Sequence, residues 1–157
     1  MKKSARSTHS RLVVPRTVGD AMHRGVVTCK RGASIVAAAR VMAAHHIHAT
    51  VVVDFDGRCV GIVTAGDLVA GLDDGTAASR TVDEIASVPA LIGPHEPLVR
   101  AVELMRDHRT THIVVTLASR RPVGMLSALD LLELVADTGR GPGELAVLAE
   151  NPQPVRG

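Results

Sequence analysis

Apolar residues recur at a helical spacing in two separate places along the chain, and each recurrence predicts an amphipathic helix. The positions follow i, i+3, i+4, i+7; they are Ile35, Ala38, Ala39 and Met42 in the first place and Leu98, Ala101, Val102 and Met105 in the second. Ser34 suits the N-cap of the first helix because its hydroxyl can accept a hydrogen bond from a free backbone N–H. Pro97 suits the first turn of the second helix, where a missing N–H loses no hydrogen bond.

Short apolar runs rich in β-branched residues follow each predicted helix in pairs, and a polar connection joins the two runs of each pair. The pairs are residues 49–53 with 60–63 and residues 112–116 with 123–126. A shorter strand precedes each helix, and a second helix ends each half. The shorter strands are predicted at residues 26–29 and 90–92, and the closing helices at residues 65–72 and 128–136. Each half therefore has the order strand, helix, strand, strand, helix, which is typical of the α+β class.

The two halves are copies of one another at a shift of 63 residues. The segment VGIVTAGDL at 60–68 aligns with VGMLSALDL at 123–131, and the predicted first helices and middle strands align at the same shift. With one residue of slack, TVGDAM at 17–22 also aligns with TVDEIA at 81–86. Agreement over a whole unit indicates an internal duplication. Burial on folding is marginal for a unit of about 60 residues, so we expect the copies to pack face to face around a pseudo-twofold axis.

The duplication divides the chain into two domains, which we place at residues 17–72 and 81–137. Between them, residues 73–80 have the Gly, Ser and Asp content of a linker. Residues 1–16 carry basic side chains and no acidic one, and we expect a mobile basic arm there. Residues 138–157 contain several Gly and Pro and are expected to form a loosely ordered tail.

Composition narrows the possible functions. The 157 residues are 46% hydrophobic with a formal net charge of +2, so no overall field favours nucleic acid or an anionic membrane as the partner. The apolar runs are far shorter than the roughly 18 residues that a spanning helix needs, and the basic N-terminus lacks the apolar run of a secretory signal. Cys29 and Cys59 are too few for a disulfide framework. We therefore expect a soluble protein of the reducing cytoplasm.

One motif occurs near the end of each copy: Gly, two apolar residues, Thr or Ser, two variable residues, Asp. It reads GIVTAGD from Gly61 to Asp67 and GMLSALD from Gly124 to Asp130. Because the motif occurs twice in register, behind matching helices and strands, the chain resembles a tandem pair of CBS domains, the regulatory module named after cystathionine β-synthase. The resemblance implies two clefts between the repeats that bind AMP, ADP, ATP or S-adenosylmethionine as a regulatory ligand. It also implies a homodimer of paired modules, no catalysis, no other cofactor, and output through an unidentified effector protein in trans.

The motif residues have the chemistry that such a ligand needs. A ribose presents two adjacent hydroxyl groups, and the two carboxylate oxygens of Asp67 or Asp130 can accept hydrogen bonds from both. A helix that begins at the motif Thr or Ser directs its first N–H groups toward the cleft and favours an anion there. The other interpretation is plain helix capping, since Thr-x-x-Asp at a helix start is also a capping box. Ala65-Gly66 and Ala128-Leu129 lie where many nucleotide-binding relatives carry a charged residue, so a weaker grip on phosphate is expected.

By the same resemblance, the motif of one repeat shares a cleft with the first strand and the helix-to-strand junction of the other repeat. Cleft A is expected to contain Thr64, Asp67, Ala90, Leu91, Thr111 and His112. Cleft B is expected to contain Ser127, Asp130, Val27, Thr28 and His48. The two first-strand residues of each cleft would flank the base with apolar surface and backbone groups.

The stretch HHIHAT places three histidines at the end of the first predicted helix. His45 and His46 are interpreted as a solvated helix terminus, where a cation is favourable. His48 falls at the helix-to-strand junction and is the candidate phosphate contact of cleft B, with binding that strengthens below about pH 6.5 as the imidazole gains a proton. A metal site built from these histidines with His108 or His112 is an alternative, which the lack of a Cys-x-x-Cys or His-Glu-x-x-His spacing disfavours.

Two further alternatives stay open. The basic arm could add non-specific contacts to nucleic acid, although the chain has no aromatic platform on which bases could stack. Its cations are Lys2, Lys3, Arg6, Arg11 and Arg16. A CBS pair could also have lost its ligand and serve as a dimerisation or protein-docking module.

Overall fold

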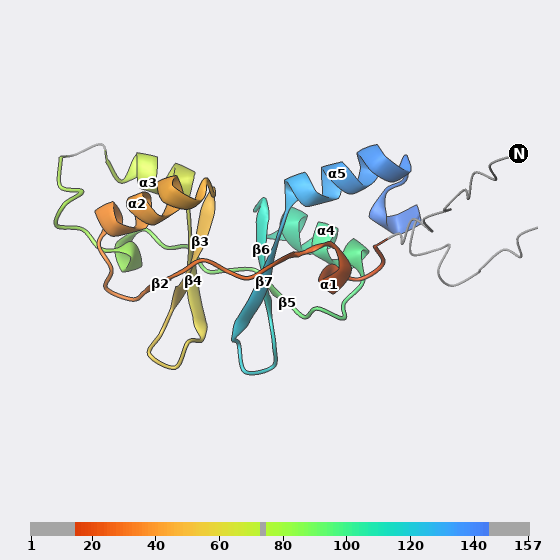
Figure 1. Ribbon diagram of the computed structural model, residues 1–157, viewed down its shortest axis with the longest axis horizontal. Coiled ribbons are helices and arrows are strands. Elements are labelled where there is room, and N and C mark those ends of the chain that lie inside the picture. Colours follow the sequence, from red (N-terminus) through yellow and green to blue (C-terminus); the bar gives the residue numbers. More distant parts are fainter. Residues whose placement is uncertain (1–14, 73–74, 145–157) are drawn as a thin grey trace, which may run out of the picture.

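The computed structural model describes residues 15–72 and 75–144, and Figure 1 shows them as two similar units side by side. Most of the predicted arm and tail, residues 1–14 and 145–157, lie outside the described residues, as do residues 73–74 of the predicted linker. No helix in the described ranges has both the length and the apolar content needed to cross a bilayer.

The first repeat has the predicted order of elements, preceded by a short segment at residues 17–24 that we call the first lead segment. Its elements are α1 (Val18–Ala21), β1 (His23–Arg24), β2 (Thr28–Lys30), α2 (Ile35–His45), β3 (Ala49–Val53), β4 (Cys59–Thr64) and α3 (Ala65–Ala70). The predicted cap is confirmed, because the Ser34 hydroxyl accepts a hydrogen bond from the backbone N–H of Ala37 at 3.1 Å. The predicted short strand begins two residues later than expected, at Thr28.

The second repeat has the same order behind a second lead segment, residues 81–88. Its elements are η1 (Val82–Glu84), β5 (Leu91–Ile92), α4 (Leu98–Asp107), β6 (His112–Thr116), β7 (Pro122–Ser127) and α5 (Ala128–Thr138). Pro97 occupies the N-cap of α4, one position before the predicted first turn. The two halves therefore share their elements, as the duplication predicts.

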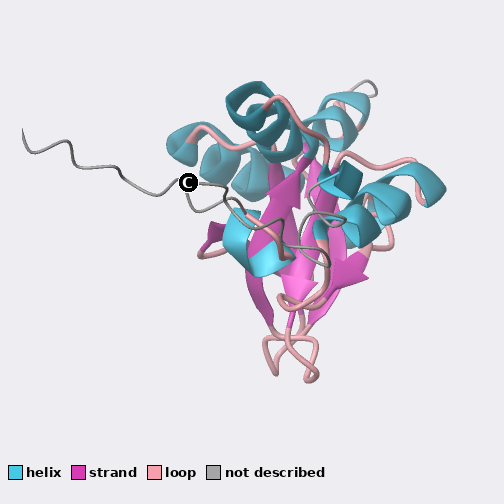
Figure 2. Ribbon diagram, turned by 90° about the vertical axis from the view of Figure 1, so that its right-hand side faces the viewer, coloured by secondary structure: helices cyan, strands magenta, loops and turns pink. Residues whose placement is uncertain are grey.

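The strands that follow each lead segment form a separate sheet in each repeat, and β1 of the first lead segment joins the sheet of the second repeat. The first sheet has the order β2-β3-β4, and the second has the order β1-β7-β6-β5. β2 runs parallel to β3, and β5 runs parallel to β6, because in each case a helix carries the chain back to the start of the sheet. β3–β4 and β6–β7 are antiparallel hairpins in equivalent registers. Figure 2 shows the helices flanking the strands and the hairpin turns protruding at the opposite end.

The lead segments are exchanged between the repeats. Val18 of the first lead segment is fully buried in the core of the second repeat beside Leu98, and β1 pairs with β7. Conversely, Val82 of the second lead segment is fully buried in the core of the first repeat beside Ile35. Hydrogen bonds hold both positions, from Gly19 N to the Pro94 carbonyl at 2.7 Å and from Val82 N to the Ala33 carbonyl at 2.8 Å. Each domain range predicted from sequence therefore includes a lead segment that completes the other repeat's core.

A third group of buried residues joins the two sheets. It contains Ala49, Val51, Val53, Cys59 and Ile62 from the first sheet and Val114 from the second, with Leu91 and Met125 packed against them. Val51 and Val114 occupy equivalent positions in the repeats and are both fully buried. The backbone N–H of Cys59 donates to the Arg120 carbonyl across the interface at 2.9 Å. Burial of a Val side chain contributes about 1.5 kcal/mol or more, so this group makes the two repeats one packing unit.

Candidate functional site

The second motif forms a complete capping box at the start of α5. The Asp130 Oδ2 atom accepts hydrogen bonds from the backbone N–H of Ser127 at 2.6 Å and from the Ser127 hydroxyl at 2.8 Å. In return, the Ser127 hydroxyl accepts from the Asp130 N–H at 3.3 Å. Thr64 and Asp67 repeat this arrangement at the start of α3, with distances of 2.8, 2.8 and 3.2 Å. Capping therefore uses one carboxylate oxygen of each motif Asp, and the second oxygen, Oδ1, is left for another partner.

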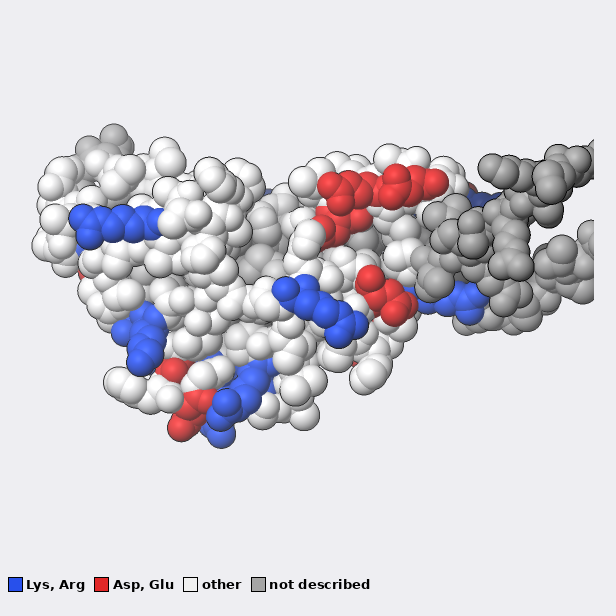
Figure 3. Space-filling view, in the orientation of Figure 1, with Lys and Arg blue, Asp and Glu red and all other residues white. Residues whose placement is uncertain are grey.

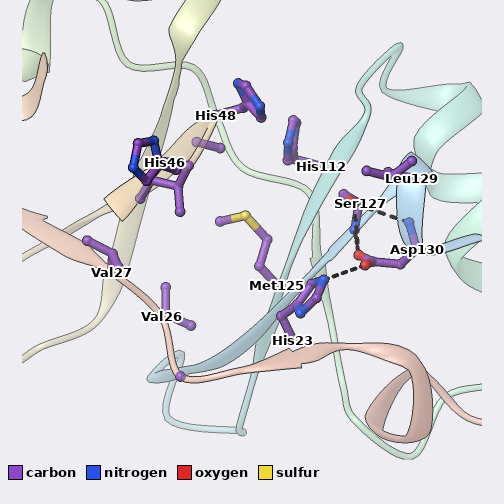
Figure 4. Close-up of a pocket in the computed structure, with 13 residues that line it drawn as sticks. His23, Val26, Val27, His46, His48, His112, Met125, Ser127, Leu129 and Asp130 are labelled. Atoms are coloured by element: carbon purple, nitrogen blue, oxygen red, sulfur yellow. Dashed lines mark hydrogen bonds and ion pairs between the residues drawn. The ribbon is translucent and has the colours of Figure 1, made fainter. Parts of the chain in front are cut away.

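A cavity of about 260 Å³ opens beside the Ser127–Asp130 motif and is lined by both repeats (Figure 4). The first repeat with its lead segment contributes His23, Gly25, Val26, Val27, His46, Ile47, His48 and Ala49. The second repeat contributes His112, Met125, Ser127, Leu129 and Asp130. Because four segments far apart in the sequence meet here, the cavity exists only when the repeats are packed together.

The structure brings together four of the five residues predicted for cleft B: Val27, His48, Ser127 and Asp130. Thr28, the fifth, lies at the start of β2 and is exposed; it is not among the residues that line this cavity. Their part in binding stays a prediction, and what the structure shows is that these four residues line one cavity. We refer to it below as the Asp130 cavity.

The residues predicted for cleft A are distributed as follows. Thr64 and Asp67 begin α3, Ala90 and Leu91 lie at β5, and Thr111 precedes β6, where its carbonyl accepts a hydrogen bond from Ala128 N at 2.8 Å. His112, the sixth, lines the Asp130 cavity. The β6–β7 register gives the reason, since His112 is the cross-strand partner of Ser127. The cleft A assignment of the other five residues stays a prediction.

Several lining residues were not anticipated from the sequence. His23 lies in the exchanged lead segment, and His46 is the C-cap of α2 in a left-handed conformation with φ of 52°. Met125 faces the cavity from the middle of β7 (Figure 4). The alignment of the two lead segments could have drawn attention to the region of His23. It does not indicate which repeat each segment packs against, and so could not place His23 in the cavity.

The carboxylate of Asp130 already has a partner on its second oxygen. The Nε2 atom of His23 lies 2.6 Å from Asp130 Oδ1, and the Asp130 side chain is only 6% exposed, whereas that of His23 is 76% exposed. Figure 4 shows the imidazole reaching from β1 to the start of α5. Asp130, the one acidic group among the described residues that line the cavity, is therefore paired with an imidazole.

Histidines supply the remaining titratable groups of the cavity. Burial lowers the pKa of His112 below its usual value, the nearby His48 lowers it further, and Asp130 acts in the opposite direction. No Lys or Arg of the described ranges 15–72 and 75–144 lines the cavity, so within them attraction for an anion rests on the imidazoles and on the N-terminal end of α5. In Figure 3 much of the visible face is uncharged, and basic side chains (blue) and acidic side chains (red) lie together at the hairpin end.

The two cysteines and the histidine stretch do not form a second site in the described part of the chain. Burial raises the pKa of the Cys29 and Cys59 thiols, which keeps both in the unreactive neutral form. Among the described residues, no three His, Cys, Asp or Glu side chains are grouped so as to hold a metal ion. His45 is exposed at the end of α2, as predicted for a solvated helix terminus.

Comparison with known proteins gives both a family match and structural relatives. The sequence matches the CBS-domain family over residues 18–74 and 82–137. It is 35% identical over 119 residues to arabinose 5-phosphate isomerase KdsD of Pseudomonas aeruginosa, an alignment that covers 73% of this chain and 36% of that protein. The chain thus spans about a third of the length of this relative.

Two solved structures resemble this fold closely. The CBS domain pair of protein MJ0100, in complex with 5-methylthioadenosine and S-adenosyl-L-methionine, has a TM-score of 0.72 and 26% identity, covering 78% of this chain and 98% of that one. The CBS domain protein PAE2072 from Pyrobaculum aerophilum, complexed with AMP, has a TM-score of 0.70 and 26% identity, covering 76% of this chain and 98% of that one.

Proposed function

The chain belongs to the CBS-domain family as a tandem pair of domains, and from this premise we propose that it is a non-catalytic regulatory module that binds an adenosine-type ligand. The ligands proposed are AMP, ADP, ATP or S-adenosylmethionine, held in the clefts between the repeats. The observation that carries the proposal is the Asp130 cavity, which both repeats build around a motif carboxylate.

The chemistry of the cavity suits a nucleoside. Asp130 Oδ1 can accept a hydrogen bond from a ribose hydroxyl while Oδ2 continues to cap α5. Val26, Val27 and Met125 offer apolar surface on which a purine can lie. Among the described residues the lining contains no Lys or Arg, which favours a ligand with one phosphate or a sulfonium over a triphosphate. The complexes of the two structural relatives with AMP and with S-adenosyl-L-methionine support the same ligand class.

A change in the bound ligand would be transmitted to a partner protein in trans. A ligand that contacts both repeats binds their alternative arrangements with different affinity and so shifts the equilibrium between them. The repeats also expose apolar side chains on or beside α3 and α5, where we propose that a second copy packs to form a homodimer. These side chains are Val69, Leu72, Leu129, Leu132 and Val135. The same apolar side chains favour the second candidate function, a ligand-free module for dimerisation or docking.

Thermal unfolding with and without AMP, ADP, ATP, NAD and S-adenosylmethionine separates the two functions. A ligand present at a hundred times its Kd stabilises the native state by about 2.7 kcal/mol, which raises Tm by about 5 °C or more. No rise with any of the five at millimolar concentration would leave the docking module as the function. Mass spectrometry of small molecules retained on the purified protein would detect a ligand outside this set.

His48 is proposed as the phosphate contact of the Asp130 cavity. We expect AMP to bind more tightly below about pH 6.5, because a protonated imidazole attracts phosphate. His48→Ala should reduce this rise in affinity, and His45→Ala is the control, because His45 is exposed and does not line the cavity. Titration calorimetry measures both, and an unchanged response in His48→Ala would assign the phosphate contact elsewhere.

A further inference from the structure

The ribose acceptor of the Asp130 cavity has both carboxylate oxygens engaged. Oδ2 accepts two hydrogen bonds within the capping box, and Oδ1 lies against His23 at 2.6 Å. A carboxylate has about four acceptor directions, and the cap and His23 together use three, so two vicinal hydroxyls need one direction more than is free. Since the cap is internal to α5, the His23 contact is the one that a ligand can displace.

We propose that His23 is a specificity-determining residue of the Asp130 cavity, which competes with the ribose for Asp130 and makes the binding of an uncharged nucleoside weaker in acid. This inference rests on the proposed function, since it concerns how His23 regulates ligand binding in the same cavity. A protonated imidazole pairs with the carboxylate as an ion, whereas a neutral imidazole offers only a hydrogen bond. Imidazoles change charge between about pH 5 and pH 8, so the competition varies over that range.

The surroundings of His23 allow this displacement. Its side chain is largely exposed and lies on the two-residue strand β1, where its backbone pairs with Met125. The charged and titratable groups near it are Asp130 at the start of α5, His112 on β6, His48 and His46 between α2 and β3, and Arg24 beside it on β1. Among these groups only Asp130 is acidic. When His23 moves away, a ligand hydroxyl can therefore take its place at the Asp130 carboxylate.

The other repeat supplies a matched control. Ser87 pairs with Ile62 in the second lead segment just as His23 pairs with Met125 in the first, and Ile62 and Met125 are equivalent positions of β4 and β7. Ser87 therefore occupies the place of His23 but carries no charge at any pH. The motif carboxylate of the first repeat, Asp67, consequently has no imidazole partner at this position.

The test measures adenosine binding by titration calorimetry at about pH 6 and about pH 8. Adenosine has no phosphate, so its binding does not report the attraction of an imidazole for phosphate, and the comparison of the parent with His23→Ala isolates the contribution of His23 from that of the other lining histidines. The protein carries Asp67→Ala throughout, which leaves the Asp130 cavity as the reporting site. We expect affinity to be about fivefold higher at the higher pH with His23 present. His23→Ala should bind equally at both values, with the affinity of the parent at the higher pH or better.

Two further variants complete the experiment. His23→Gln keeps a hydrogen-bond donor without a titratable charge and should also lose the pH dependence, while Ser87→Ala should keep the fivefold difference. An identical pH response in the parent and in His23→Ala would overturn the role of His23 and leave the proposed function intact. Failure of adenosine, AMP and S-adenosylmethionine to bind the unmodified protein at either pH would refute the proposed function, and this inference with it.

Discussion

The two motifs of this chain, Thr64–Asp67 and Ser127–Asp130, have the same local geometry and different surroundings. Both form capping boxes whose hydrogen bonds agree within about 0.2 Å. Asp130 is buried and paired with His23, whereas Asp67 is half-buried and Ser87 stands at the position equivalent to His23. The difference arises in the lead segments, which are exchanged between the repeats. The helix caps are thus the same in both copies. The lead segment that packs against each motif determines whether a titratable side chain lies beside the motif carboxylate.

The largest expected effect is on stability. It tests whether equivalent core positions of the two repeats contribute equally to the free energy of unfolding. Ile35 and Leu98 occupy equivalent positions at the start of α2 and α4 and are 0% and 2% exposed. Truncation of either to Ala removes buried methyl groups and leaves a cavity, so we expect each to reduce the free energy of unfolding by about 3 kcal/mol. Urea unfolding measures both. A loss confined to one variant would contradict the equivalence of the two repeats, and a second, unshifted transition in either variant would show that they do not unfold together.

The second prediction concerns two equivalent glycines, at which the lead segments approach β4 and β7. A Cβ added at Gly124 would collide with the Met22 Sδ atom and lie 2.8 Å from the His23 carbonyl oxygen. At Gly61 the nearest atom would be the Ala86 Cβ at 3.1 Å. Gly124→Ala should therefore destabilise the protein by about 2 kcal/mol, and Gly61→Ala by less than about 1 kcal/mol. Thermal unfolding of the two variants measures the difference. Equal losses would contradict the tighter packing of the first lead segment.

Most of the fold could be predicted because the duplication supplies each helical and strand pattern twice. β3 and β6 occupy the predicted residues, and the Ser34 cap is where the side-chain chemistry places it. The destination of the lead segments could not be predicted, because α1 has four residues and η1 has three. Segments so short carry little periodicity, and contacts far along the chain, such as Val18 with the core around Leu98, decide where they pack.

The site was predictable to the same degree, and for the same reason. Residues within the duplicated motif and at the helix-to-strand junction, such as Ser127, Asp130 and His48, do lie together. His23 was missed because it belongs to an exchanged segment. His112 was assigned to cleft A by its position in the repeat, which stays a prediction; its place in the lining of the Asp130 cavity was missed, because that follows from its cross-strand pairing with Ser127. Side-chain proximity here depends on strand register and exchange, which spacing along the chain does not determine.

The third prediction separates ligand binding by the two motifs. Asp130→Ala should reduce affinity for AMP in the Asp130 cavity by about tenfold, because a hydrogen bond to a charged acceptor contributes about 1.5 kcal/mol or more. Asp67→Ala should leave that cavity unaffected. Calorimetric stoichiometry and affinity distinguish the variants. Each substitution also removes a cap, with a loss of stability of about 1 kcal/mol, so Tm is measured alongside. Unchanged binding in Asp130→Ala would refute the ribose assignment.

The smallest expected effect concerns His112, whose equivalent in the first repeat is the uncharged Ala49. Because its pKa is lowered in the folded protein, the unfolded chain binds the proton first as pH falls. Stability should therefore decrease, by less than about 1 kcal/mol, as pH falls from about 6.5 toward the lowered pKa of His112. The half-exposed and exposed carboxylates with lowered pKa, such as Asp83, lose their contribution only at lower pH, near and below about 4.

Urea unfolding at several pH values between about 7 and about 5 measures this contribution. His112→Ala should have a smaller loss of stability over the range than the parent protein, whatever its stability at neutral pH. His45→Ala is the control, since His45 is exposed and its removal should leave the pH dependence unchanged. The same pH dependence in His112→Ala as in the parent would assign the acid sensitivity of the fold to another group. A reduced pH dependence would show that His112, on β6, makes the second repeat more sensitive to acid than the first.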